Sequence, residues 1–426
     1  MATVSRQLPH RPHLDVPKRE ARELLAELRA GQAPAFDRTR RCHPRYHDTT
    51  DSAFARVTFK LSDAQQVIAR EYGFNTWAAL KQRIDGASTA SLLQTAIEHG
   101  DRDVVVELLR AHPALLHVPL WSGNWGPPMS HAANLGRLEI VQAVAELGAR
   151  DYQHAFDRAV LQGQIECARW LHAHSAKLLP GIIMGSCETL NLSGFKFLLE
   201  LGAPLVDVQG NRLAPLSLVL ETYARNPVGK HGILELFAAQ GYTWPDTPMM
   251  ALHRGDLARL REFLRQDPRL LERRFSLSEL YPPECGCAHA GRSGMHWTPL
   301  DGTTLLHLAI DFRERAIFDW LLAEGIDVNA PATKDSEGFG DHTALFNAVV
   351  SGPSNDSFFA AELLKRGARR DPRASLRKFL DWCEQPRWHE ARAVTPAEWA
   401  DTFPERGWVN EATVALVKTE QPPVHA

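Results

Sequence analysis

The residues of this 426-residue chain that are best suited to chemistry lie in the segment "YPPECGCAHAGRSGMHW" (281–297). Cys285, Cys287, His289 and His296 could together supply the four thiolate and imidazole ligands that zinc prefers. The C-x-C-x-H spacing argues against this, because structural zinc sites usually separate their first two cysteines by two to four residues. A metal-binding protein or metal-dependent enzyme centred on 281–297 is therefore the alternative hypothesis, and reduced cysteines without a cofactor are the leading one.

A cysteine nucleophile would need an activating base and a lowered thiol pKa. His289 is close in sequence to both cysteines, but no further residue supplies an orienting group or an oxyanion hole. The segment "GFGDH" (338–342) also lacks the G-x-x-x-x-G-K-[ST] pattern of a phosphate-binding loop. We therefore predict no catalytic residues and expect that the protein is not an enzyme.

Composition narrows the class of partner. The formal charge is -3, and no domain is basic enough to indicate nucleic acid as the main ligand. Hydrophobic residues make up 44% of the chain. No apolar run reaches the roughly 18 residues of a membrane span, and the first residues show no secretory signal. Six scattered cysteines favour a reducing compartment. We expect a cytoplasmic monomer that binds an unidentified protein, with no nucleic acid and no membrane involved.

The elements that must position these residues follow a repeated pattern. The stretch "GTTLLHLAIDFRERAIFDWLLAEGIDVNA" (302–330) predicts a helix that Thr304 caps, a turn, and a second helix that stops at Gly325. Residues 128–149, 155–176 and 195–203 fit the same template, and their helix stops at Gly148, Ser175 and Gly202 are 27 residues apart. The segment 100–116 also aligns without gaps on 255–271. Self-similarity at fixed spacing indicates stacked supersecondary units.

This motif resembles the ankyrin repeat. The matching positions are Gly302, Thr304, Leu306, His307, Ala309, Leu321, Leu322, Gly325 and Asn329. Leu305 stands where the family has Pro, and Ile326 stands where it has Ala. The resemblance implies an all-α solenoid of paired antiparallel helices, with about eight partly degenerate repeats between residues 90 and 370. It also implies binding of proteins through loop tips and inner helices, with His307 linking its own turn to a neighbour by hydrogen bonds.

The two ends extend this array. Residues 1–86 predict an N-terminal helical domain, in which "LSDAQQVIAREYGFNTWAALKQRI" resembles a segment that precedes ankyrin arrays in bacterial proteins of unassigned function. Residues 87–375 would form the array. Residues 376–426 would form a C-terminal capping repeat and a tail, with helices at 395–400 and 409–418 and almost no sheet anywhere.

Two enlarged loops, 272–301 and 331–342, interrupt the array at consecutive loop tips, which lie side by side in a solenoid. We therefore expect one shared partner-binding surface there. Its candidate residues are Tyr281, Glu284, His289, His296, Trp297, Asp335, Glu337, Phe339 and His342. Alternatively, the loops fold over the array and bury Tyr281 and Trp297. A third connecting segment, "HVPLWSGNWGP" (117–127), carries Trp121 and Trp125. These residues either form a binding hot spot or pack between the N-terminal domain and the first full repeat.

We conclude that the protein is a non-catalytic interaction scaffold. It would present loop tips and a concave groove to a partner protein, and the stacked core would hold those loops in place before binding.

Overall fold

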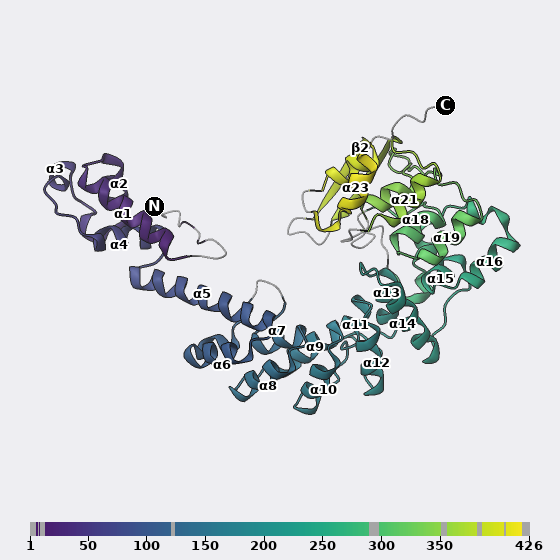
Figure 1. Cartoon of the computed structure of the whole chain (residues 1–426), viewed down its shortest axis with the longest axis horizontal. Helices are drawn as coiled ribbons and strands as arrows, with labels where there is room; N and C mark the ends of the chain where they lie inside the picture. The colour runs from purple at the N-terminus through teal and green to yellow at the C-terminus, as the bar shows by residue number, and fades with distance from the viewer. Residues whose placement is uncertain are drawn as a thin grey trace. The chain divides into compact units, whose positions relative to one another are not determined.

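A computed structural model describes Arg6, Leu8 and residues 13–120, 124–288, 298–350, 356–380, 386–403 and 406–419. The chain forms two compact units, which we call unit 1 (residues 1–159 and 166–176) and unit 2 (residues 160–165 and 177–426). Helices dominate both units, which confirms the expectation of a mostly helical protein (Figure 1).

Unit 1 begins with a helical bundle that has a hydrophobic core of its own. Its helices are α1 (Asp15–Arg29), α2 (Ala33–Cys42), α3 (Asp51–Phe54) and α4 (Leu61–Glu71). Helix α1 buries Leu24 and Leu28, and the rings of Phe36 and Phe54 stack with their centroids 4.7 Å apart. Helix α1 is amphipathic, and its apolar face covers this core.

Helix α5 (Trp77–His99) leads out of this bundle without a break at residue 86. Thr76 caps its start by accepting a hydrogen bond from the Ala79 backbone N–H, and Gly100 ends it in the left-handed conformation. The helices that follow in the chain are α6 (Arg102–Ala111), α7 (Pro128–Asn134), α8 (Leu138–Glu146), α9 (Tyr152–Gln162) and α10 (Ile165–Ala173).

Unit 2 consists mainly of helix pairs. They are α11 (Met184–Glu188) with α12 (Leu192–Glu200), α13 (Ala214–Glu221) with α14 (Pro227–Ala239), α15 (Pro248–His253) with α16 (Leu257–Gln266), α18 (Leu305–Asp311) with α19 (Arg315–Ala323), α20 (Ala344–Val349) with α21 (Phe358–Lys365), and α22 (Pro396–Asp401) with α23 (Glu411–Lys418). Helix α20 contacts both α18 and α22, so the first helices of successive pairs pack on one another.

The same tight turn joins the two helices in several pairs. The residue in the turn has a positive φ, +65° at Gly255 and +61° at Arg313. The next backbone N–H then reaches back to a carbonyl of the first helix, from Asp256 to Ala251 and from Glu314 to Ala309, at 2.8 Å in both cases. Glycine adopts this conformation without a steric penalty, which explains the glycines that mark the repeats in the sequence.

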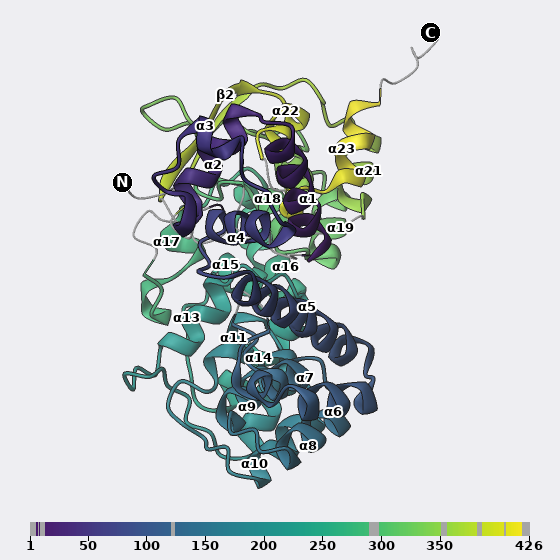
Figure 2. The ribbon, with the colours of Figure 1, turned by 90° about the vertical axis from the view of Figure 1, so that its left-hand side faces the viewer.

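The predicted C-terminal capping repeat has the expected helices α22 and α23, but a β-hairpin precedes them. Strands β1 (Ala374–Leu380) and β2 (Arg387–Val394) pair antiparallel, with Phe379 opposite Trp388. Every second residue of β1 is buried, which is the period of a strand and not of a helix. One two-stranded sheet agrees with the expectation of almost no sheet, but the sequence did not predict these strands within the cap. Figure 2 shows β2 beside α22, which it contacts.

Short helices complete the described elements. Helix α17 (Leu277–Leu280) lies in the loop between α16 and α18 and begins with a capping box in which Ser276 and Glu279 bond each other's backbone N–H groups. Short 3-10 helices lie at Pro44–Tyr46, Pro113–His117, Pro268–Leu271, Pro283–Cys285 and Arg406–Trp408.

Candidate functional site

The cysteine-containing loop packs inward. Tyr281, Cys285 and Cys287 are 2%, 0% and 7% exposed. Gly286 packs so closely on the start of α13 that a Cβ at this position would lie 2.6 Å from a side-chain atom there. Burial raises the pKa of the Cys285 thiol to about 11 and also raises the pKa of the Cys287 thiol. Both thiols are therefore protonated at neutral pH, and the thiol is a poorer nucleophile and metal ligand than the thiolate.

The remaining residues of the hypothetical metal set are not described. His289 and His296 lie outside the described residues, as does Trp297. Within the parts of the chain that are described, no group of three or more His, Cys, Asp or Glu side chains is placed to hold a metal ion. Glu284 is exposed. Tyr281 is a buried anchor of the loop, as the alternative expectation has it, and not a surface contact; its ring lies 5.9 Å from the ring of His253.

A buried polar network lies beneath Tyr281. The Lys230 Nζ is 2.5 Å from His253 Nδ1, and His253 Nε2 is 2.7 Å from the Leu280 carbonyl oxygen. Because a carbonyl can only accept, Nε2 carries the proton and Nδ1 accepts from the lysine. Burial lowers the pKa of His253 and keeps its ring neutral, whereas burial and the charge of Arg225 lower the pKa of Lys230 to about 7.

One ion pair and one histidine–carboxylate contact in this network span from the α13–α14 pair to the α18–α19 pair. Arg225 Nη2 lies 2.7 Å from Asp311 Oδ2, with both side chains at most 9% exposed. His231 Nε2 lies 2.8 Å from Glu314 Oε1. The chain between these pairs contains the whole α15–α16 pair, so the contacts skip one repeat of the pattern. Repeat units normally contact only their neighbours, so three successive helix pairs are linked here.

Sequence reasoning did not identify this network. Arg225 and Asp311 are 86 residues apart. Arg225 lies in the connection between α13 and α14, and Asp311 is the last residue of α18. Lys230 lies in a stretch that fits the repeat template poorly. No spacing rule relates these residues, because the fold alone brings them together. The one signal in the sequence is Lys230, a lysine within an apolar segment. A lysine that is buried there needs a polar partner, because lysine is almost never fully buried without one.

The enlarged loops do lie side by side. The described residues of the loops that precede α18, α20 and α22 (272–288, 298–303, 331–342, 374–380 and 386–394) form what we call the loop strip. The Thr333 N–H donates to the Gly302 carbonyl at 2.8 Å, and the Gly340 N–H donates to the Ser375 carbonyl at 2.7 Å. Backbone bonds therefore join each loop of the strip to the next one.

His342 connects the loops of the strip through buried hydrogen bonds. It is 1% exposed, and its Nε2 donates to the Pro299 carbonyl at 3.0 Å. Its own carbonyl accepts from His307 Nε2 at 3.0 Å, and the Thr304 hydroxyl donates to His307 Nδ1 at 2.8 Å. His307 thus links its own turn to a neighbour as expected, whereas Thr304 uses its hydroxyl for this bond and makes no side-chain cap. His342 is corrected from a surface residue to a buried link.

Arg377 of β1 holds the middle loop of the strip. Its guanidinium lies 2.9 Å from Asp335 Oδ2 and 2.6 Å from Glu337 Oε2. The same guanidinium stacks 4.5 Å from the ring centroid of Phe339, and Arg392 stacks at 4.1 Å. Phe339 is 4% exposed and is corrected from a surface contact to the packed centre of this arrangement. Asp335 and Glu337 remain exposed, but each is already paired within the chain.

Among the described residues of the strip, Trp388 is the large aromatic residue with an exposed side chain. It is 53% exposed on β2, and its ring packs edge-on against Phe379 with the centroids 5.3 Å apart. The guanidinium of Arg377 lies 5.4 Å from the same ring. Trp388 was not among the predicted surface residues, because residues 376–426 were interpreted as a capping repeat and a tail. The alternation of β1 was the available signal.

The connecting segment 117–127, which carries Trp125, belongs to unit 1. Trp125 is half-buried, and its ring packs 5.0 Å from the ring of His131 on α7. Its neighbour Asn124 accepts a hydrogen bond from Arg158 at 3.2 Å, while Arg158 also bonds Asn134. Trp121 lies outside the described residues. Trp125 therefore packs on the first helix of the following pair.

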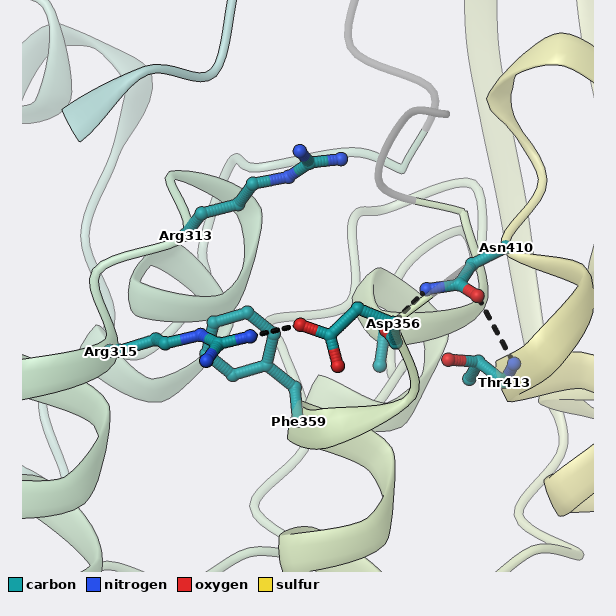
Figure 3. A pocket seen from close by; sticks show the side chains of 7 residues that line it. Arg313, Arg315, Asp356, Phe359, Asn410 and Thr413 are labelled. Atoms are coloured by element: carbon teal, nitrogen blue, oxygen red, sulfur yellow. Dashed lines mark hydrogen bonds and ion pairs between the residues drawn. The ribbon is translucent and has the colours of Figure 1, made fainter. Parts of the chain in front are cut away.

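A pocket opens beside the turn between α18 and α19 (Figure 3). Its volume is about 150 Å³, and its lining residues are Arg313, Arg315, Ala348, Asp356, Phe359, Asn410 and Thr413. Arg315 pairs with Asp356, and the Asn410 amide donates to the Asp356 backbone carbonyl at 2.9 Å. A non-glycine residue in the conformation of Arg313 costs roughly 1–2 kcal/mol, so the turn stores strain at the rim of this pocket.

Comparison with known proteins agrees with the repeat pattern. The family model for the ankyrin repeat matches residues 301–332, which include α18 and α19. A search of curated proteins gave no match. Among the described helices, none combines the length and the apolar character needed to cross a bilayer. The family match coincides with the helix pair whose turn, hydrogen bonds and following loop are given above, so residues 301–332 match an ankyrin repeat.

Proposed function

We propose that this protein is a non-catalytic protein-interaction module. Its helix pairs would stack as an ankyrin solenoid of about eight partly degenerate repeats, and the loop strip and the concave face of the first helices would receive a partner protein. The observation that carries the proposal is Trp388, a large aromatic side chain that is 53% exposed on a loop strip otherwise bonded into place. Exposed tryptophan beside arginine is the composition of a binding hot spot.

Fixed loops would contribute to affinity by lowering the cost of ordering. Arg377 pairs with two carboxylates of residues 331–342, and backbone bonds join that loop to both neighbours. Each exposed ion pair is worth only about 0–1 kcal/mol to stability. Their effect on binding is different, because a loop that is already held loses little conformational entropy when a partner docks.

The described cysteines support a reducing compartment for this activity. Cys42, Cys167, Cys187, Cys285 and Cys287 are all free and buried. Free thiols in this number are typical of proteins that remain in the cytosol. We therefore place the module in the cytoplasm, as a monomer that engages one protein partner.

The test is affinity capture with quantitative mass spectrometry, using the full chain and its Trp388→Ala variant as baits. Val228→Ala is the matched control, since Val228 on α14 is 76% exposed and lies outside the loop strip. We expect at least one protein to be enriched by the wild type and by Val228→Ala and lost with Trp388→Ala. Both side chains are exposed, so neither change should unfold the chain.

Two further measurements make the result decisive. A photo-crosslinking residue placed at 388 should give a covalent adduct with the captured protein, and the same residue at 228 should not. Identical capture by all three baits, with no adduct at 388, would show that the loop strip is not the binding surface.

A further inference from the structure

The loop before α18 leaves the repeat pattern and returns to it at a single point. We call its described residues, 276–288 and 298–301, the insert. The Phe275 N–H donates to the Thr303 carbonyl at 2.9 Å, and the Gly302 N–H donates to the Phe275 carbonyl at 2.8 Å. Because these bonds close the two ends of the loop on each other, the insert is an addition to the α18–α19 pair.

Two first helices of unit 2 are buried on all sides. All seven residues of α18 and all six residues of α20 are buried, whereas only four of the eight residues of α13 are. A first helix in an open array keeps one face toward solvent, because its second helix and its neighbours cover only the other faces. The groove that the first helices form is therefore closed over α18 and α20.

The first part of the insert packs on the first helices that precede α18. Tyr281 is 2% exposed, and its ring lies 5.9 Å from that of His253, the last residue of α15. His253 Nε2 donates to the Leu280 carbonyl at 2.7 Å. Gly286 packs closely on Leu213 at the start of α13. A buried aromatic anchor beside a bonded main-chain carbonyl is how a groove binds an extended peptide.

The second part of the insert lies on the helices that follow α18. Trp399 Nε1 of α22 donates to the Thr298 hydroxyl at 3.3 Å, and this hydroxyl lies 3.2 Å from the carbonyl of Val350, which follows α20. His342 Nε2 donates to the Pro299 carbonyl at 3.0 Å. Bonds to main-chain carbonyls depend little on the side chains of the bound segment, so another extended segment could accept them as well.

One polar group is left unmatched in the closed groove. Asn347 of α20 is 0% exposed, and both polar atoms of its side-chain amide lack a hydrogen-bond partner among the described residues. Burial of an unpaired amide destabilises the closed state, and a segment that bonded this amide would bind better than the insert does.

We propose that the insert is an intramolecular inhibitor of the groove. An extended segment of a partner, with an aromatic side chain in the place of Tyr281, displaces it. The inference rests on the proposed function for the existence of that partner. It makes the groove of unit 2 a site that opens only by competition, because the insert is tethered to it and is always present at a high effective concentration.

The test asks whether the sequence of the insert binds as a separate peptide. The probe is a fluorescein-labelled peptide of residues 276–288 with Cys285→Ser and Cys287→Ser, and fluorescence anisotropy follows its binding to full-length proteins. Tyr281→Ala removes the internal anchor, so this protein should bind the peptide at least about tenfold more tightly than the wild type does. Glu284→Ala is the matched control, since Glu284 is exposed in the same segment, and it should behave as the wild type. A peptide that also carries Tyr281→Ala should bind to none of the proteins.

Hydrogen exchange on the Tyr281→Ala protein shows whether the insert has left the groove. We expect faster exchange in residues 276–288 while α18, α20 and α21 stay protected. Unchanged exchange in the insert, or loss of protection in α18 and α20 as well, would make the insert a permanent part of the core and overturn the proposal. A released insert without peptide binding would also overturn it. None of these results depends on Trp388, so failure of the proposed function would be recognised separately.

Discussion

Replacing Lys230 by methionine should remove a pH dependence of stability that the wild-type protein carries. Lys230 is 4% exposed, and its pKa falls from 10.5 to about 7 in the folded state. Between these values the unfolded chain binds a proton that the folded chain does not, so stability rises with pH. Linkage with these two values gives a gain of about 2 kcal/mol between pH 7 and pH 9.

The assay is urea unfolding followed by tryptophan fluorescence at pH 7, 8 and 9, for the wild type and Lys230→Met. Other titrating groups contribute equally to both proteins, so the difference between the two pH slopes isolates Lys230. The variant should lose the rise, although its absolute stability also reflects the donor that His253 Nδ1 no longer has. Equal slopes would refute the reasoning, because they would mean that Asp311 and Glu314 keep the folded amine as protonated as the unfolded one.

Three further changes test the loops and the turns. Arg377→Ala should release residues 331–342, seen as faster hydrogen exchange there, with a global loss of no more than about 1–2 kcal/mol because its ion pairs are exposed; unchanged exchange would contradict its clamping role. Gly255→Ala should cost about 1–3 kcal/mol in urea unfolding, since φ is +65° and the new Cβ would lie 2.1 Å from an imidazole carbon, and a neutral result would contradict the tight turn. The double variant Cys285→Ser, Cys287→Ser should bind as little zinc as the wild type by elemental mass spectrometry and should be less stable, because hydroxyl groups replace buried thiols; one equivalent of zinc lost in the variant would restore the metal hypothesis.

The sequence predicted the features that depend on local rules. The predicted helix stops at Gly148, Gly202 and Gly325 appear in the structure, and each glycine has the positive φ that a helix terminator adopts. The role of His307 was also predicted correctly, because its partners lie at a fixed spacing within the repeat and in the adjacent loop. These features repeat along the chain, so the repeat that matches the pattern best allows the same features to be predicted in the weaker repeats.

The candidate surface was predicted less well, because burial of a loop residue is a property of the whole fold. Phe339 is aromatic in an exposed-looking loop, yet two arginines from the hairpin enclose it. Tyr281 similarly packs over His253, which comes from the preceding helix pair. The hairpin was not predicted, because the repeat template was extended over β1, whose residues alternate between buried and partly exposed as in a strand.

The two contacts that skip the α15–α16 pair, Arg225 with Asp311 and His231 with Glu314, also limit how this chain can change in evolution. Repeat proteins ordinarily gain or lose a unit by duplication or deletion, since each unit depends only on its neighbours. Excising α15–α16 here would change the distance between Arg225 and Asp311 and would leave buried charges uncompensated. We therefore expect evolution to retain this stretch of the array as a block of three units, so that length variation among homologous chains occurs outside it.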